Sequence, residues 1–474
     1  MNKSVVNTGG ILRLSVVSDF VGPSQSCILP LQKKNEIDEP PQVKIRAKKE
    51  RPKELSNSKD DSAKKITVSL SDCLACSGCI TTAETMFLES QTMNELLEGL
   101  QARKFSVITV SPQSVSSLAV RYQISSSEMA KRISTFFKSK GAAYVIDSSF
   151  ARLITHKLVA QELLERFKNG VRLPLISSVC PGFVLYAEKT VEEEFLPLLS
   201  CVRSPQALSG SLVKDYLAKK MAIDPADIFH ACVMPCSDKK LEASRADFTV
   251  PGTSIKEVDC VISTIELEAE LNKFESSNGY YIPENLSHDW LTRFQNGLLI
   301  GDGQRTTSGG LTEYLCREFE SCLTHSSDVE KGFYKTKIIR DDLVHLNYYS
   351  TSDEEPIFTF IKAYGFRNLR DILRKLKKQQ VGKNVYFIEI MACPSACGSG
   401  GGQIRAEKET DRKLLSQKVQ EEYSMIKLNH DEQSEVLKEV DSLIEEWQTL
   451  NADMEKLFYT EFHSVPKNAN LNDW

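Results

Sequence analysis

The sequence lacks any long hydrophobic run. Among its 474 residues the apolar stretches, such as Val385 to Met391, are far shorter than the roughly 20 residues that a membrane-spanning helix needs. The N-terminal stretch, MNKSVVNTGGILRLSVVSDF, has one early lysine and a broken apolar segment, without the continuous core or cleavage site of a signal peptide. We therefore expect no membrane segment and a cytosolic protein, with access to the nucleus left open.

The sequence also lacks an excess of positive charge. Its 59 Lys and Arg are outnumbered by 64 Asp and Glu, and the net charge of -5 gives no support for direct nucleic-acid binding. The loop GDGQRTTSGG (301–310) has no Walker lysine, which argues against a phosphate-binding loop. The 7 histidines, including His156, His230 and His463, form no ligand pair at helical spacing. These absences leave cysteine as the main candidate ligand.

Cysteine is what the chain has in quantity, with 13 residues. A reducing compartment disfavours structural disulfides, so grouped cysteines there are more often metal ligands or redox groups. Five cysteines show no partner spacing that groups them as metal ligands, and we expect them to be buried, inert thiols. They are Cys201, Cys232, Cys260, Cys316 and Cys322. The remaining cysteines form two groups.

The first group is Cys73, Cys76 and Cys79, with the spacing C-x2-C-x2-C. Three thiolates at this spacing can converge on one compact inorganic cluster, and the same run opens many bacterial ferredoxin sites. A fourth ligand is needed, and Cys27, the unassigned upstream cysteine, is expected to supply it although nothing local demands it. Zinc is the alternative occupant of this group, and a chance cysteine-rich loop without a metal is the other alternative.

The second group follows three predicted strands. These strands and the cysteines after them are 174–179 with Cys180, 228–234 with Cys236, and 385–391 with Cys393 and Cys397. Ligands collect at the carboxyl ends of strands in open α/β sheets, so the cysteines are expected to meet at one point. The glycines from Gly398 to Gly402 would let the backbone approach a bulky inorganic group closely.

The chain reads as an α/β protein from about residue 100 onward. Further strands are predicted at 105–110, 142–147 and 259–264, and helices at 212–221 and 368–378. Asp224 and Pro225 are typical of the cap and first position of another helix. An apolar stripe in the last 70 residues predicts helices that pack on the main body, and it comprises Leu437, Val440, Leu443, Ile444 and Trp447.

These patterns divide the chain into four segments. Residues 1–98 form an N-terminal cluster-binding segment, which contains a charged, proline-rich linker at 32–65. Residues 99–257 form a first α/β lobe, and 258–406 a second lobe with the glycine-rich loop. Residues 407–474 form a C-terminal helical extension and tail.

Several segments resemble the signatures of iron-only hydrogenases. They are Ser177-Ser178-Val179-Cys180-Pro181 in altered form, Met234-Pro235-Cys236-x-x-Lys239-x-x-Glu242, the turn Thr307-Ser308-Gly309-Gly310, and Glu389-x-Met391-Ala392-Cys393-x-x-x-Cys397-x-x-Gly400-Gly401-Gly402-Gln403. With the N-terminal cysteines, the match extends over nearly the whole chain. The sequence is similar to the iron-only hydrogenase-like family of cytosolic iron–sulfur assembly factors, related to the nuclear prelamin A recognition factor.

The resemblance implies a two-lobed, iron-only hydrogenase-like α/β body with an N-terminal ferredoxin-like cluster segment and a C-terminal helical extension. It implies two 4Fe-4S clusters, an inner one with four ligands, Cys180, Cys236, Cys393 and Cys397. The implied role is to help pass a cluster to cytosolic and nuclear apoproteins within the cytosolic assembly machinery. The implied partners are a targeting complex, formed by a WD40-repeat protein and associated subunits, and apo client proteins.

Departures from the hydrogenase pattern argue against hydrogen chemistry. Val179 stands where hydrogenases carry a proton-relaying cysteine, and a proton-reducing site needs a general acid within reach. Phe183 replaces tryptophan, Ser395 and Ala396 replace a double glycine, and Ile404 replaces proline. We therefore expect a protein without hydrogenase activity. An electron-transfer or hydrogenase-type redox protein is the alternative, and a zinc-dependent interaction module a third.

Two further features have two readings each. Lys239 could bind an anionic ligand or simply pair with Glu242 near the cluster. The ending Asn472-Asp473-Trp474 resembles tails by which iron–sulfur proteins engage the targeting complex, although an aliphatic residue is usual at the position of Asn472. A frayed terminus is the alternative.

Overall fold

A computed structural model describes residues 82–191, 193–278, 306–326, 332–350, 355–406, 408–426 and 430–464. Cys27, Cys73, Cys76, Cys79 and Trp474 lie outside the described residues, as does the predicted linker at 32–65. Within the described ranges, every helix is too short or too polar to cross a bilayer.

The first sheet is fully parallel. Its order is β2 (Tyr144–Asp147), β1 (Phe105–Val110), β4 (Ile228–Met234) and β5 (Cys260–Ser263). Every residue of β4 is buried, which fits the near-continuous apolar runs of strands covered on both faces. The predicted strands at 105–110 and 228–234 coincide with β1 and β4, and those at 142–147 and 259–264 contain β2 and β5.

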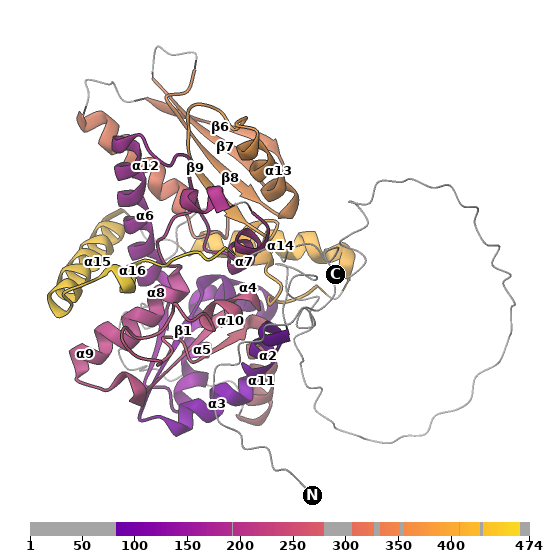
Figure 1. Ribbon diagram of the computed structural model, residues 1–474. Helices are drawn as coiled ribbons and strands as arrows, with labels where there is room; N and C mark the ends of the chain where they lie inside the picture. The colour runs from indigo at the N-terminus through magenta and orange to yellow at the C-terminus, as the bar shows by residue number, and fades with distance from the viewer. Residues whose placement is uncertain are drawn as a thin grey trace, which may run out of the picture.

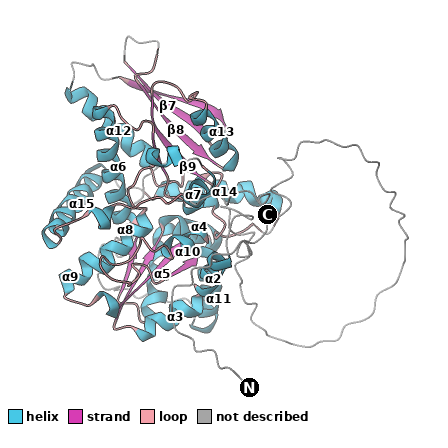
Figure 2. Ribbon diagram, in the orientation of Figure 1, coloured by secondary structure: helices cyan, strands magenta, loops and turns pink. Residues whose placement is uncertain are grey.

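The second sheet is mixed. Its order is β3 (Leu175–Ser177), β9 (Val385–Met391), β8 (Phe358–Tyr364), β7 (Leu343–Tyr349) and β6 (Phe333–Arg340). The first three strands run parallel, whereas β8, β7 and β6 pair antiparallel. Figure 2 shows the two groups of strands well separated, with helices around each. The three strands β6, β7 and β8 were not predicted from the sequence.

The two sheets interleave along the chain. β3 precedes β4 in sequence but pairs with β9 of the second sheet, and β5 precedes β6 but pairs with β4 of the first. Neither sheet is therefore built from one continuous segment. The division of the chain into segments at 257 and 406 stays a prediction.

The helices surround the sheets (Figure 1). The α-helices are α2 (Thr82–Ser90), α3 (Met93–Ala102), α4 (Pro112–Tyr122), α5 (Ser126–Ser139), α6 (Ser149–Asn169), α7 (Pro181–Thr190), α8 (Pro205–Ser211), α9 (Ala218–Met221), α10 (Asp238–Ala243), α11 (Thr264–Asn278), α12 (Leu311–Ser326), α13 (Phe366–Lys377), α14 (Arg412–Met425), α15 (His430–Leu450) and α16 (Glu455–Phe458). The tighter or wider turns are η3 (Glu193–Leu198), η4 (Leu212–Leu217), η5 (Pro225–Asp227), η6 (Ala396–Ser399) and η7 (Glu409–Asp411).

Local sequence accounts for several helix starts. Ser111 and Ser125 accept hydrogen bonds from the backbone N–H groups of Ser114 and Glu128, which caps α4 and α5. Asp224 caps in the same way, as predicted, but it begins only the short 3-10 turn η5. The predicted helix at 212–221 is the second half of one run formed by α8, the π-helical η4 and α9.

The C-terminal helices pack on the body. Val440, Leu443 and Trp447 of α15 lie in one buried cluster with Ile154 and Leu158 of α6. Figure 1 shows α15 and α16 beside α6 and α8. This placement confirms the interpretation of the apolar stripe as a packing face.

Candidate metal centre

The ends of three strands carry the second group of cysteines. Cys180 follows β3 and is the residue before the first turn of α7, Cys236 lies between β4 and α10, Cys393 follows β9, and Cys397 lies in η6. β3 and β9 are neighbours in the second sheet, whereas β4 belongs to the first. Figure 1 shows α7, which starts after Cys180, between the two sheets. The cysteines therefore come from both sheets.

The thiols influence one another electrostatically. Burial raises the pKa of Cys236 well above its usual value, and Asp238, Cys393, Cys180 and Cys397 raise it further. Burial raises the pKa of Cys397 to about 12, and Cys180 contributes in the same direction. Each of these thiols therefore acts electrostatically on at least one of the others, and their assignment as ligands of one cluster stays a prediction.

The donor set fits an iron–sulfur cluster. Within the described ranges, no three His, Cys, Asp or Glu side chains are close enough to hold one metal ion. The four thiolates of a cube bind different iron atoms, so they stand farther apart than the ligands of a single zinc ion. A thiolate ligand must be deprotonated, and the positive charge of bound iron would offset the burial that raises these pKa values.

Backbone amides also face the buried thiol of Cys180. Burial raises the pKa of Cys180, while the backbone N–H groups of Ala392 and Phe183 lower it by hydrogen bonding. The Ser178 hydroxyl donates to the Ile390 carbonyl at 2.6 Å and accepts from the Cys180 N–H at 3.2 Å. The ends of β3 and β9 are thus fastened together at the cysteines.

Two glycines bring the Cys397 loop against the Cys236 loop. A Cβ at Gly400 would lie 2.3 Å from the Pro235 carbonyl oxygen, and one at Gly402 would lie 3.2 Å from Cys236 Cα. The Gly402 N–H donates to the Pro235 carbonyl at 3.0 Å. These two glycines therefore serve a close backbone approach between strand ends of different sheets.

The turn at 307–310 supports the same loop. The Thr307 hydroxyl donates to the Ser395 carbonyl at 3.0 Å and accepts from the Gly398 N–H at 2.7 Å. Ser395 and Ala396, which replace the hydrogenase glycines, both adopt left-handed backbone conformations, with φ of 56° and 61°. This loop keeps the glycine-type backbone without the glycines.

A small cavity adjoins Cys397. Its volume is about 60 Å³, enough for only a few water molecules. Its walls include Val179, Lys239, Ser308, Glu389 and Met391, together with the buried Arg152. Val179, which has no titratable proton, thus faces the space beside a candidate ligand.

Lys239 and Glu242 form a buried ion pair, which confirms the pairing interpretation. Lys239 Nζ lies 2.7 Å from Glu242 Oε2, and their side chains are 8% and 7% exposed. Ser204, which caps α8, donates to Glu242 and lies 3.2 Å from Lys239 Nζ. Lys239 also lines the cavity, so the pair stands between the thiols and the network around Ser204.

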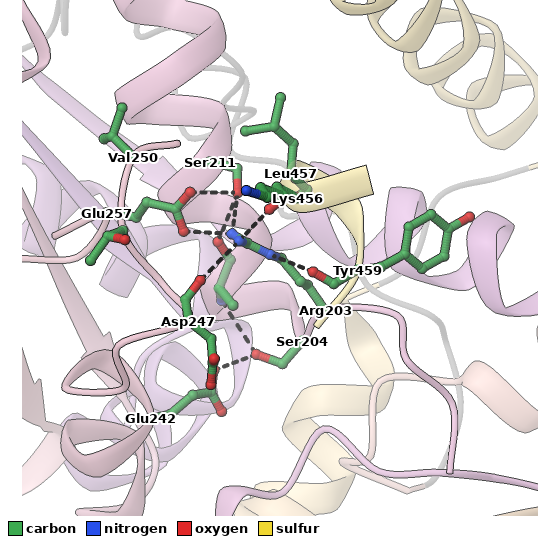
Figure 3. A network of polar contacts seen from close by, with 12 residues as sticks. Arg203, Ser204, Ser211, Glu242, Asp247, Val250, Glu257, Lys456, Leu457 and Tyr459 are labelled. Atoms are coloured by element: carbon green, nitrogen blue, oxygen red, sulfur yellow. Dashed lines mark hydrogen bonds and ion pairs between the residues drawn. The ribbon is translucent and has the colours of Figure 1, made fainter. Parts of the chain in front are cut away.

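Arg203 joins this network to the C-terminal segment (Figure 3). Its guanidinium donates to Glu257 Oε2 at 2.5 Å and to the Ser211 hydroxyl at 2.7 Å. It also donates to the carbonyls of Lys456 and Tyr459. Arg203 was not predicted, because an isolated arginine carries no spacing signal.

The cysteines that were predicted to be inert thiols lie in different parts of the fold. Cys232, Cys260 and Cys316 are buried, as expected, whereas Cys322 is half-buried. Cys201 is exposed, so its prediction as a buried thiol is wrong: it lies in the short connection between the bridged residues Leu199 and Val202.

The buried histidines are structural. The His230 ring lies 2.8 Å from the Thr109 hydroxyl and 2.9 Å from the Glu257 carbonyl, and burial lowers its pKa to about 4. Burial likewise lowers the pKa of His156. Neither ring is a metal-ligand candidate.

Comparison with known families defines the class of protein. Residues 104–401 match the family described as iron only hydrogenase large subunit, C-terminal domain. The chain belongs to this family, and the match covers every cysteine of the second group.

Relatives that align over the whole chain have names that are more specific than the family description. The chain is 42% identical over 468 residues to the probable cytosolic Fe-S cluster assembly factor oxy-4 of Caenorhabditis elegans, covering 97% of each chain. It is 36% identical to the cytosolic iron-sulfur assembly component 3 of Rattus norvegicus, again covering 97% of each.

Solved structures share the fold. An [FeFe]-hydrogenase superposes with a TM-score of 0.61 at 23% identity, covering 78% of this chain and 98% of that chain. The apo [FeFe]-hydrogenase HydA1 from Chlamydomonas reinhardtii gives 0.60 at 23% identity, covering 78% and 99%. The predicted hydrogenase-like α/β fold is thereby confirmed for the body of the chain.

Proposed function

We propose that this chain is a component of the cytosolic iron–sulfur protein assembly machinery. The observation that carries the proposal is a set of four electrostatically coupled thiols, which follow strands of both sheets. The chain that contains them belongs to the iron-only hydrogenase family. Relatives that it matches over 97% of its length are named cytosolic assembly factors. The names of the relatives also support placing this chain in the cytosol.

The chain would hold two 4Fe-4S clusters. Cys180, Cys236, Cys393 and Cys397 would be the ligands of the inner one, and Cys27, Cys73, Cys76 and Cys79 those of the outer one. Bound clusters supply exchangeable iron and sulfide and a one-electron couple. The residues of the chain position the thiolates, exclude water around Cys180 and Cys393, and compensate charge through Lys239.

We propose that the chain has no hydrogenase activity. Val179 lines the cavity next to Cys397, and its side chain has no proton to transfer. This observation favours an assembly factor over the alternative, a hydrogenase-type redox protein.

The proposed partners are the cytosolic targeting complex, with its WD40-repeat protein, and apo iron–sulfur clients. Asp473 and Trp474 would provide a docking tail for that complex. The proposed segments remain 1–98, 99–257, 258–406 and 407–474, with the α/β lobes holding the inner cluster between them.

A matched pair of cysteine variants tests the inner site. Cys236→Ala should lose about half of the bound iron and acid-labile sulfide in anaerobically purified protein, because it removes one proposed ligand. Cys260→Ala is the control, since Cys260 is buried at the first residue of β5, the opposite end of the strand from the edge where Cys236 follows β4. Equal iron content in Cys236→Ala and wild type would contradict the ligand assignment.

Cys76→Ala addresses the outer cluster separately. We expect it to remove the other half of the iron while the EPR signal of the inner cluster persists. Zinc in place of iron at this group would support the interaction-module alternative.

Two measurements distinguish assembly from redox chemistry. In cells lacking their own assembly factor, wild-type chain should restore iron incorporation into a cytosolic iron–sulfur enzyme, and Cys236→Ala should not. Infrared bands of iron-bound carbon monoxide or cyanide should be absent from the purified protein, and their presence would establish the hydrogenase form.

A further inference from the structure

A groove on the outer side of the second sheet has an apolar floor. Its volume is about 650 Å³, and it lies between the end of α7, η3 and one face of α13. Tyr186 and Phe366 meet edge-to-face across it, with ring centroids 5.1 Å apart. Phe195 and Leu373 continue the floor, and Phe366 is 37% exposed. This α7–α13 groove therefore offers aromatic and aliphatic surface to an incoming side chain.

The rim of the α7–α13 groove is basic. α13 has the sequence FRNLRDILRKLK, with five basic side chains and one acid. Arg367 and Arg370 are exposed and line the groove, and neither forms an ion pair with another described residue. Arg374 is partly engaged with Asp371 at 3.3 Å. This concentration of positive charge contrasts with the net charge of -5 for the whole chain.

Both walls of the groove begin at candidate ligands. α7 starts directly after Cys180, and the Gly365 N–H that precedes α13 donates to the Cys393 carbonyl at 3.1 Å. α7 has 10 residues, so its far end lies roughly 15 Å from Cys180 at 1.5 Å per residue. An occupant of the groove would therefore contact two helices whose first residues adjoin the cysteine loops.

We propose that the α7–α13 groove is the docking site of a partner protein that presents an acidic segment with an aromatic or large aliphatic anchor. The anchor would fill the apolar floor beside Tyr186 and Phe366, and carboxylates on either side would pair with Arg367 and Arg370. Charge complementarity selects this chemistry, because exposed arginines beside an aromatic floor suit a partner that combines carboxylates with an apolar group. The inference goes beyond the proposed assembly role and does not depend on it.

The probe is a short labelled peptide, Asp-Leu-Glu-Trp-Asp, measured by fluorescence anisotropy on the full, cluster-loaded chain. We expect saturable binding that weakens as the salt concentration rises, because exposed ion pairs are screened. Replacing Leu and Trp in the peptide by Ser, or its carboxylates by amides, should each weaken binding about tenfold. Failure of the parent peptide to bind would overturn the proposal.

Charge-reversal variants locate the site. Arg367→Glu with Arg370→Glu should weaken peptide binding at least about tenfold. Lys413→Glu with Lys418→Glu, on exposed positions of α14, makes the same change in charge and should leave affinity within about twofold. If both double variants lost affinity for the peptide equally, the effect would come from net charge alone and the proposal would be overturned. Phe366→Ser tests the floor without changing charge.

Other occupants give distinguishable results. Phosphatidylserine vesicles or a single-stranded oligonucleotide could instead bind the chain. If that binding is lost in Arg367→Glu with Arg370→Glu but unaffected by Phe366→Ser, the groove binds an anion of this kind and the protein-partner proposal fails. If the peptide binds only after residues 465–474 are removed, the occupant is the chain's own tail and the partner proposal fails. Iron content of each variant, measured in parallel, separates these outcomes from any failure of cluster binding.

Discussion

The two sheets of this protein contribute unequally to the candidate metal centre. The four-stranded parallel sheet supplies Cys236 alone, whereas the mixed sheet supplies Cys180, Cys393 and Cys397. Within the mixed sheet, all three cysteines follow the parallel strands β3 and β9, and the antiparallel hairpin β6–β7 supplies none. Strand direction explains this, because parallel strands bring their carboxyl ends to one edge and an antiparallel hairpin does not.

The two sheets also differ in burial. β4 is buried along its whole length, whereas β6 is mostly exposed. The first sheet therefore depends on internal packing, and the second combines a buried parallel part with an exposed edge. We therefore expect the effect of a substitution on stability to be largest at the junction between the two sheets. It should be smaller in the interior of each sheet and smallest at the exposed edge of the second.

The largest effect is expected at the junction. Leu199 bridges to Ile176 of the second sheet, and Arg203 pairs with Glu257 just before β5 of the first, with side chains 2% and 1% exposed. Arg203→Met leaves a buried carboxylate without its partner, which typically costs about 3–5 kcal/mol. Urea unfolding followed by circular dichroism measures the loss.

A double variant provides the control for this prediction. Arg203→Met combined with Glu257→Leu should recover a large part of the loss, since the uncompensated charge is gone. A loss below about 1 kcal/mol in the single variant would mean that Arg203 does not join the two halves.

The buried His230 should make the first sheet sensitive to acid. Burial lowers its pKa from 6.5 to about 4, so below pH 6.5 the unfolded state binds a proton that the folded state excludes. Stability is therefore full above pH 6.5 and is lost as pH falls toward 4. Between pH 7.5 and 5.5 the loss from this group is about 1 kcal/mol.

A histidine of the second sheet gives the comparison. His345 in β7 is only half-buried, and burial lowers its pKa as well. His230→Gln should flatten the dependence of unfolding free energy on pH more than His345→Gln does. The reverse order would show that the hairpin, not the parallel sheet, is the acid-sensitive part.

A gain in stability is expected at the cysteine loop of the second sheet. Ser395 has a φ of 56°, which costs a residue with a Cβ about 1 kcal/mol more than glycine. Ser395→Gly should raise the free energy of unfolding by about 0.5–1 kcal/mol, offset in part by the entropy of glycine in the unfolded chain. Ser395→Ala is the control and should bring no gain, because it keeps the Cβ.

The smallest effect is expected at the exposed edge. Ile338 in β6 is 72% exposed, so Ile338→Thr should change stability by less than about 0.5 kcal/mol. Ile388→Val in the buried β9 should cost about 0.5–1.5 kcal/mol, although it removes a single methylene. Comparable melting-temperature shifts for the two variants would contradict the difference in burial.

The strands that feed the site could be predicted from the sequence because they are buried on both faces. β4 and β9 coincide with predicted runs of apolar and β-branched residues, and β3 lies within the predicted strand at 174–179. β6 and β7 were missed, because FYKTKIIR and LVHLNYY mix polar and apolar residues without the alternation of a half-buried strand. β8 was missed although FTFIKAY is fully buried, since its lysine interrupts the apolar run and pairs with Glu313 in the fold.

The sequence by itself predicted how the cysteines group, because ligand spacing and the strand before each cysteine are local properties of the chain. Its resemblance to hydrogenases also showed that valine, at Val179, stands where those enzymes carry a proton-relaying cysteine. Only the tertiary structure decided that the cysteines come from two interleaved sheets, that Gly400 and Gly402 join those sheets, and that Arg203 fastens the C-terminal segment nearby. The physical reason is that these contacts join residues far apart in sequence, and packing alone brings such residues together.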